Sequence, residues 1–204
     1  MYLQCNNSFN HELKIFEIFQ NQTLEKIQEN PYCLIEAVNG IGFLTADKIA
    51  EKFGIEKNSP FRLRAGLVHT LKIASDRNGH TFLPKKNLYQ ETCKLLTVEL
   101  SAVQDTFDKI LNNLAIEQVI CYSKIENEEI VALEKLYRFE QKLAQKIILQ
   151  NQYSSTVSQN LKEAISHFEK VHHITFHQEQ KNAIECALTS GISVITGGPG
   201  TGKT

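Results

Sequence analysis

The feature that most constrains this chain is a glycine-rich stretch at residues 197–204, "GGPGTGKT", which fits the phosphate-loop pattern G-x-x-x-x-G-K-[ST]. It directly follows "ISVIT" at 192–196, a β-branched run typical of a buried parallel strand. A helical segment that ends at Gly191 precedes this run. Helix, strand and glycine loop in this order predict the beginning of a P-loop α/β domain. A glycine-rich turn that matches the pattern by chance is the alternative.

The composition of the loop suits a nucleotide phosphate. Glycines let successive backbone N–H groups wrap around a phosphate at a closeness that side chains would block. Lys203 is expected to reach the β- and γ-phosphates of ATP as the catalytic cation, and the Thr204 hydroxyl to bind Mg²⁺. The amide of Gln180, on the preceding helix, can recognise adenine, although the residue also fits an ordinary exposed helix position. The predicted nucleotide-binding residues are Gln180, Gly197, Gly198, Pro199, Gly200, Thr201, Gly202, Lys203 and Thr204.

A second motif, "VNGIGFLTADKIA" at 38–50, fits the pattern h-x-G-h-G-x-x-x-A-x-x-h, where h is hydrophobic. Two helices joined by Gly-hydrophobic-Gly form a hairpin whose backbone N–H groups face outward just before a helix begins. That geometry holds a phosphate without recognising a base. The predicted DNA-binding residues are Gly40, Ile41, Gly42, Thr45 and Lys48, with Ile41 anchoring the turn in the core. A plain helix–helix turn with glycine C-caps is the alternative.

The charge around this motif differs from that of the whole chain. The chain carries a net charge of −1, which gives no indication of nucleic acid. Between Lys48 and Lys72, however, six basic residues stand against two acidic ones, a local net charge of +4. This basic stretch favours nucleic acid as the partner of the hairpin. Contact through the backbone alone predicts sequence-independent binding with a steep salt dependence.

Helical periodicity, punctuated by proline and glycine, runs through most of the chain. Asn30-Pro31 and Ser59-Pro60 are expected to begin helices, and Ser101 to cap another. Helices are predicted over 32–38, 43–53, 61–77, 85–100, 102–115, 134–150 and 160–171. Two β-like runs at 117–122 and 129–133, joined by a polar turn at 123–128, predict a winged-helix-like β-hairpin.

The predicted fold is therefore mainly α and divides into four regions. Residues 1–78 form a helix-hairpin-helix bundle that contacts DNA, and 79–150 a helical, winged-helix-like region. Residues 151–157 form a polar linker, and 158–204 begin the α/β nucleotide-binding domain.

Composition excludes several classes of protein. No apolar run approaches the roughly 18 to 20 residues of a membrane helix, and the first residues lack a signal peptide's apolar core, so a cytoplasmic protein without a membrane partner is expected. The five cysteines are scattered and never form a C-x-x-C pair, which indicates reduced thiols. His172, His173 and His177 lack the partners of a metal site and suit a solvated helix entry.

Taken together, the motifs resemble the RecD-like (RecD/TraA-type) ATP-dependent DNA helicases of bacteria, in the version with a long N-terminal extension. The resemblance rests on "NPYCLIEAVNGIGFLTADKIA", "GHTFLPKKNL", "LYRFEQKLAQKI" and "QEQKNAI" followed by "VITGGPGTGKT", in the order of the family. It implies a superfamily 1 motor that moves along single-stranded DNA from the five-prime toward the three-prime end, using ATP and Mg²⁺. In that family Gln180 matches the adenine-recognising glutamine, and Lys203 and Thr204 the phosphate-loop lysine and the Mg²⁺ ligand.

The family's acidic Mg²⁺ and water-activating pair, its arginine fingers and its strand-separating pin all follow the phosphate loop. The chain is therefore expected to be an interior piece of a longer protein, ending in a truncated RecA-like ATPase motor domain and inactive by itself. Sequence-independent binding of single-stranded or junction DNA, by a helicase that acts as a stand-alone monomer when intact, is the expected partnership. A non-enzymatic helix-hairpin-helix DNA-binding module and an unrelated P-loop ATPase with a helical interaction domain are the alternatives.

Overall fold

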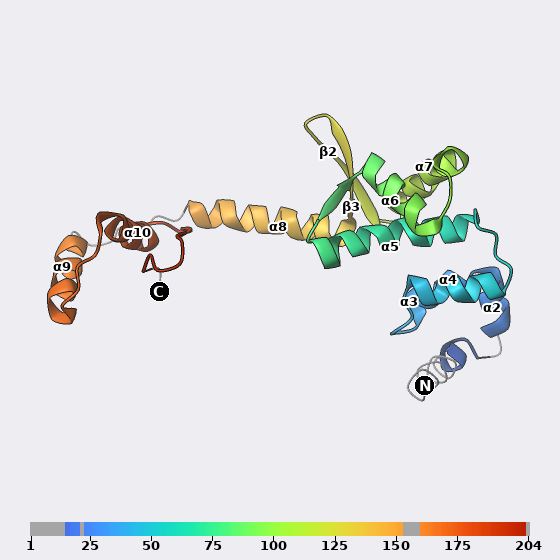
Figure 1. Ribbon diagram of the computed structural model, residues 1–204, viewed down its shortest axis with the longest axis horizontal. Coiled ribbons are helices and arrows are strands. Elements are labelled where there is room, and N and C mark those ends of the chain that lie inside the picture. The colour runs from blue at the N-terminus through green and yellow to red at the C-terminus, as the bar shows by residue number, and fades with distance from the viewer. Residues whose placement is uncertain (1–14, 21–22, 153–159, 203–204) are drawn as a thin grey trace. The chain divides into compact units, whose positions relative to one another are not determined.

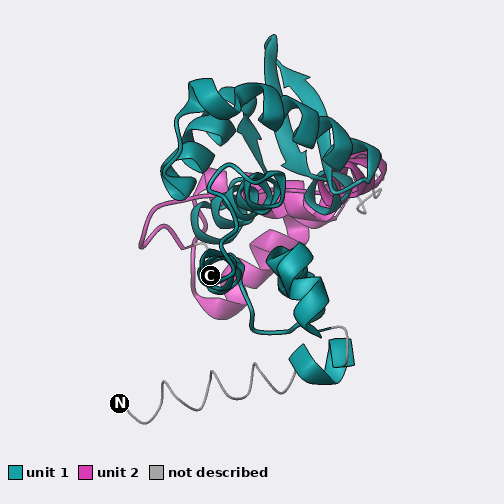
Figure 2. Cartoon of the chain, turned by 90° about the vertical axis from the view of Figure 1, so that its right-hand side faces the viewer, with its two compact units in different colours: residues 1–138 teal, residues 139–204 magenta. Residues whose placement is uncertain are grey.

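The structure is a computed structural model that describes residues 15–20, 23–152 and 160–202 (Figure 1). The chain divides into two compact units, residues 1–138 and 139–204, coloured separately in Figure 2. Each unit is described by itself below. The predicted linker at 151–157 begins at the last residue of a helix, Asn151, and lies mainly outside the described residues.

The first unit begins with the predicted helix-hairpin-helix. Its elements are α2 (Thr23–Glu29), the 3₁₀ turn η2 (Pro31–Cys33), α3 (Leu34–Ala37) and α4 (Phe43–Lys52). The Asn30 side chain accepts the N–H of Tyr32 at 3.1 Å, and Pro31 follows, so the predicted cap is confirmed. The chain leaves α4 through Gly54, whose φ of +75° confirms the predicted stop. The helix expected over 32–38 is divided between η2 and α3.

The remainder of the first unit has the element order of a winged helix. It comprises α5 (Pro60–Asn78), β1 (Phe82–Pro84), α6 (Lys85–Leu96), α7 (Leu100–Ile116), β2 (Ile120–Ile125) and β3 (Glu128–Leu133). The strands form an antiparallel sheet in the order β1-β3-β2, with Val131 of β3 between Leu83 and Tyr122. The β2–β3 hairpin extends away from α5 (Figure 1). The predicted hairpin is confirmed, whereas β1 was not predicted.

Three boundaries in this region correct the sequence predictions. The turn between β2 and β3 is Glu126-Asn127 alone, with φ of +48° and +70°, so the strands include residues assigned to a turn at 123–128. The helix α6 ends at Leu96 because Thr97 adopts a left-handed φ of +55°. Ser101 is not the cap of α7: Glu99 occupies that position, because Leu100 packs against the core as the first helical residue.

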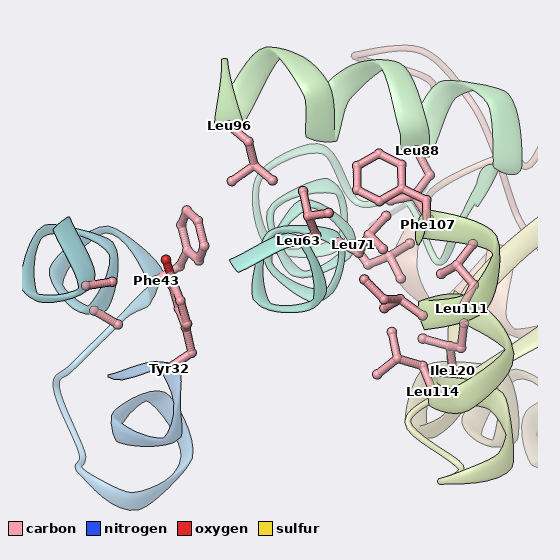
Figure 3. Close-up of a cluster of buried hydrophobic side chains, with 14 of the residues drawn as sticks. Tyr32, Phe43, Leu63, Leu71, Leu88, Leu96, Phe107, Leu111, Leu114 and Ile120 are labelled. Carbon is pink, nitrogen blue, oxygen red and sulfur yellow. The ribbon is translucent and has the colours of Figure 1, made fainter. Parts of the chain in front are cut away.

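One hydrophobic core joins the hairpin helices to the winged helix. The helix α5 lies at its centre, where Leu63 and Leu71 are buried (Figure 3). Leu67 of the same helix is also fully buried. Phe43 of α4 and Phe107 of α7 belong to the same cluster. Residues 1–78 and 79–138 are therefore held together by packing across α5, which belongs to the first of these two ranges.

The second unit contains the later part of α8 (Glu134–Asn151), α9 (Leu161–His172) and α10 (Gln178–Thr189). The predicted strand at 192–196 is wrong: these residues are irregular, and Val194 is 83% exposed. A parallel strand forms only against a neighbouring strand that satisfies its backbone groups, and the structure describes none beside this run. Along the ranges described, no helix combines the length and the apolar character that crossing a membrane requires.

Candidate functional site

The hairpin at 38–42 presents exposed backbone on a buried anchor. Ile41 is only 4% exposed, and its N–H donates to the Val38 carbonyl at 3.1 Å. Gly40 and Gly42 on either side are exposed. Ile41 is thus buried, as its predicted anchoring role requires, and the glycines on both sides of it are exposed.

The two glycines serve different purposes. Gly40 has a φ of +98°, which favours glycine over any residue with a side chain. Gly42 has an extended backbone (φ −92°, ψ 177°) and caps α4, where its carbonyl accepts the N–H groups of Thr45 and Ala46 at 3.1 Å. A Cβ atom added at Gly42 would meet no atom within 4 Å. Neither the backbone conformation nor the packing of the protein requires glycine at position 42. The space that a side chain would occupy there is open, so a ligand can approach the backbone.

Two polar side chains of α4 stand near the start of the helix. Thr45 is half-buried and Lys48 is exposed. Within the ranges described, Lys48 forms no salt bridge, and the same holds for Lys52 and Lys57. Lys48 therefore provides a free positive charge on the helix that follows the hairpin loop, whereas Lys52 and Lys57 lie at and beyond the other end of that helix.

The hairpin is fixed to α5 by a network that the sequence did not reveal. Arg62 donates to both carboxylate oxygens of Asp47, from Nε at 2.8 Å and from a terminal nitrogen at 3.0 Å, and Tyr32 donates its hydroxyl to Asp47 at 2.6 Å. Arg62 also donates to the carbonyls of Lys57 (3.1 Å) and Leu96 (3.0 Å). One guanidinium therefore connects the hairpin, the loop before α5 and the end of α6.

The electrostatics of this network follow from its partial burial. Burial by itself would raise the pKa of Asp47, but hydrogen bonds from Arg62 and Tyr32 outweigh it and lower that pKa. Burial and the hydrogen bond to Asp47 raise the pKa of Tyr32. Arg62 and Arg64 both belong to the basic stretch at 48–72, yet Arg62 is paired with Asp47 and Arg64 with Glu117. The cations available to a ligand are consequently the lysines.

The later part of the winged helix, which leads into α7 and runs to the end of β3, is acidic. From Thr97 to Leu133 the sequence holds two basic and seven acidic residues, a net charge of −5. Lys85, at the start of α6, pairs with Asp108 of α7 at 2.7 Å and with Glu129 of β3 at 3.7 Å. Tyr89 donates to the same Asp108 at 2.7 Å. This cluster connects α6, α7 and the β2–β3 hairpin, and the charge of Lys85 is neutralised within it.

The second unit brings Gln180 and the glycine loop together. The Gln180 Oε1 atom accepts the N–H of His177, and its Nε2 donates to the Thr201 carbonyl at 3.2 Å. A Cβ atom at Gly202 would lie 2.6 Å from Gln180 Nε2, so this contact depends on a glycine. Thr201 in turn donates its hydroxyl to the Gly198 carbonyl at 2.9 Å. Both ends of the Gln180 amide are thus engaged within the protein.

The loop itself has the conformation that its glycines predict. Gly200 and Gly202 adopt φ of +79° and +71°, and the residues from Gly197 to Gly202 are exposed. A hollow of about 250 Å³ lies between the loop and α10, lined in part by Gln180, Gly197 and Thr201. Lys203 and Thr204, the predicted catalytic cation and Mg²⁺ ligand, lie outside the described residues.

Glu169 of α9 orients the segment that leads to Gln180, a role that the sequence did not indicate. Its carboxylate accepts the N–H of Phe176 at 2.7 Å and pairs with Lys181 at 2.9 Å. These contacts, led by the one from Lys181, lower the pKa of Glu169. His177, predicted to be solvated at a helix entry, is exposed and caps α10 in a reciprocal arrangement with Gln180.

Comparison with known proteins matches residues 3–82 to the family model of the ATP-dependent RecD2 DNA helicase HHH domain. The chain is also similar to the ATP-dependent RecD2 DNA helicase of Deinococcus radiodurans, with 24% identity over 210 aligned positions that cover 96% of this chain and 28% of the relative. The chain thus spans little more than a quarter of that relative's length. These findings confirm the predicted resemblance to the N-terminal region of a RecD-like helicase.

Proposed function

We propose that this chain is the DNA-contacting and ATP-binding N-terminal region of a superfamily 1 DNA helicase that moves from the five-prime toward the three-prime end. The hairpin supports this proposal most: open glycine backbone lies at the start of α4, which carries the exposed Lys48, within the residues that match the HHH domain. Phosphates held in this way give binding to single-stranded or junction DNA without sequence preference. The intact helicase acts as a stand-alone monomer.

Nucleotide binding belongs to the second unit. The positive φ of Gly200 and Gly202 and the hollow beside them suit a phosphate chain, and Gln180, which lines the same hollow, is the residue we expect to meet the adenine. To recognise adenine, the Gln180 amide must exchange the Thr201 carbonyl for the base. By their place in the motif, Lys203 would hold the phosphates and Thr204 the Mg²⁺. Bound ATP with Mg²⁺ supplies the free energy that drives movement.

Binding of labelled DNA by the purified chain tests the hairpin. Gly42→Leu should lower affinity at least tenfold while leaving the melting temperature unchanged, because the new side chain enters open space and blocks the approach of a phosphate. Glu51→Leu, which places the same side chain at another exposed position of α4, should cause no loss. Retained affinity in Gly42→Leu would refute the phosphate-binding role of the hairpin.

The motor function is tested on the intact helicase. Unwinding should require a five-prime single-stranded tail and ATP with Mg²⁺, and Lys203→Ala should abolish it. The isolated chain should show no ATP turnover, because hydrolysis requires groups beyond the phosphate loop. DNA binding without unwinding by the intact protein would favour a DNA-binding module, and ATP turnover indifferent to DNA would favour an unrelated P-loop ATPase.

A further inference from the structure

A cleft of about 260 Å³ opens in the first unit between the hairpin helices and one face of α5. Ile35 of α3 and Phe43 of α4, which stand at either end of the hairpin loop, both line it. The α5 wall carries Phe61, Val68 and His69. Figure 3 shows Phe43 on the side of the hairpin helices that faces α5. Two residues that line the cleft, Ile35 and Phe43, therefore lie in the sequence on either side of the residues proposed to hold phosphates.

Several of the side chains that line the cleft are aromatic, among them Phe43, Phe61 and His69. Phe43 stacks on His69, with ring centroids 4.9 Å apart and an interplanar angle of 24°. Phe61 stands at the cleft with 42% of its surface exposed. Burial, together with the charges of Lys72 and Arg77, lowers the pKa of His69, so its ring is neutral at physiological pH. Such walls favour a flat ring that can stack, as a nucleobase does.

Charged side chains also line the cleft: Arg64 and Lys72 of α5 and Glu36 of α3. Lys72 is exposed, and Arg64 is one-third exposed in its pair with Glu117. Both cations project from the same face of α5 as Phe61 and Val68, since these residues follow one another at helical spacing. A stacking surface with adjacent cations is complementary to an aromatic ring that carries a phosphate.

We propose that this cleft holds one unpaired nucleobase of the DNA that the hairpin binds, with the adjacent phosphate beside Lys72. The proposal rests on the proposed function, because it takes the DNA to be at the hairpin. It adds a property that the hairpin lacks: backbone contacts to phosphates do not distinguish paired from unpaired DNA, whereas a cleft that stacks a single base does. The first unit therefore prefers DNA with an unpaired base.

The test compares single-stranded with fully paired DNA on the purified chain, using oligonucleotides that contain 2-aminopurine. The wild-type chain should bind the single strand more tightly and change the fluorescence of the stacked base. Val68→Trp, which fills the cleft, and Phe61→Ala, which removes a stacking wall, should lower single-strand affinity about tenfold and leave duplex affinity unchanged. Phe53→Ala is the matched control, since Phe53 is 41% exposed and lies outside the cleft.

A second variant covers the case in which Val68→Trp alters the fold. Lys72→Ala changes an exposed side chain and should lower single-strand affinity more than duplex affinity, whereas Lys94→Ala, exposed on α6, should change neither. Single-strand binding that is unaffected in Phe61→Ala and Lys72→Ala would overturn the proposal. So would tight binding of free AMP that does not compete with DNA. Loss of all DNA binding in Gly42→Leu alone, by contrast, bears on the hairpin and not on the cleft.

Discussion

The helix-hairpin-helix and the winged helix of the first unit share one hydrophobic core, and the exposed lysines from Lys48 to Lys57 contrast with the acidic segment that runs from α7 to β3. The helix-hairpin-helix and the winged helix are both arrangements that proteins commonly use to bind nucleic acid. Lys48, Lys52 and Lys57 are exposed and form no salt bridge among the described residues. The segment from Thr97 to Leu133 carries a net charge of −5. This local difference in charge, rather than the arrangement of helices, supports the proposal that the hairpin meets DNA.

The position of Lys85 illustrates the difference. Its ammonium group is held by Asp108 and Glu129, so it neutralises acidic side chains and is not offered to a phosphate. In the hairpin region the paired cation is Arg62, which is partly buried, and the exposed cations remain available. Lys85 therefore contributes to the contacts within the winged helix and is not a free cation of its surface.

The largest expected effect concerns the shared core. Leu67 of α5 is fully buried, so Leu67→Ala should lower the free energy of unfolding of the first unit by about 3 kcal/mol. Because α5 packs against both regions, far-UV and aromatic signals should report one common transition in urea. Two separate transitions would show that the regions fold independently.

The next largest expected effect distinguishes Arg62, which is partly buried, from Arg64, which is more exposed. Arg62→Ala removes the partner of a partly buried carboxylate and should cost roughly 2 to 3 kcal/mol of unfolding free energy. Arg64→Ala removes a more exposed pair and should cost less than about 1 kcal/mol. Urea denaturation of both variants measures the difference. Equal losses would contradict the anchoring role of Arg62.

A smaller effect is expected from acid. The pKa values of Asp47 and Asp108 are lowered in the folded state, Asp108 chiefly by the hydrogen bond from Lys85. An aspartate in the unfolded chain titrates near pH 3.9, so both contribute stability above about pH 4 that is lost as the pH falls further. The urea midpoint should therefore decline below pH 4, and less steeply in Asp108→Asn. A midpoint that rises on acidification would contradict these contacts.

Much of the fold could be predicted from local signals. Proline and glycine mark the ends of α4 and α5, and the pattern at 38–50 identifies the hairpin, because these features depend on neighbouring residues. The strand β1 was missed because a run as short as Phe82–Pro84 has no visible alternation and is defined only by its pairing with β3. The prediction at 192–196 was wrong for the opposite reason. The β-branched residues of this run indicate a strand, but a strand forms only when a neighbouring strand pairs with it.

The candidate site was predictable to a similar extent. Gly40, Ile41 and Gly42 follow from the motif, whereas the joining of Asp47 to Arg62 depends on how α4 packs against α5. The charge count between Lys48 and Lys72 included Arg62 but not Asp47, which directly precedes Lys48. Because Asp47 pairs with Arg62 in the structure, the surface of this stretch is less basic than the count indicates. Residue counts along the chain cannot reveal which charges cancel.

The most direct test of the central claim, that the hairpin binds DNA, is the salt dependence of DNA affinity in two matched variants. Lys48 lies beside the hairpin and Lys124 on β2, and both are exposed. Lys48→Ala should weaken binding and reduce the slope of log affinity against log salt by about one, while Lys124→Ala should leave the slope unchanged. A reduced slope in Lys124→Ala with an unchanged slope in Lys48→Ala would contradict the claim.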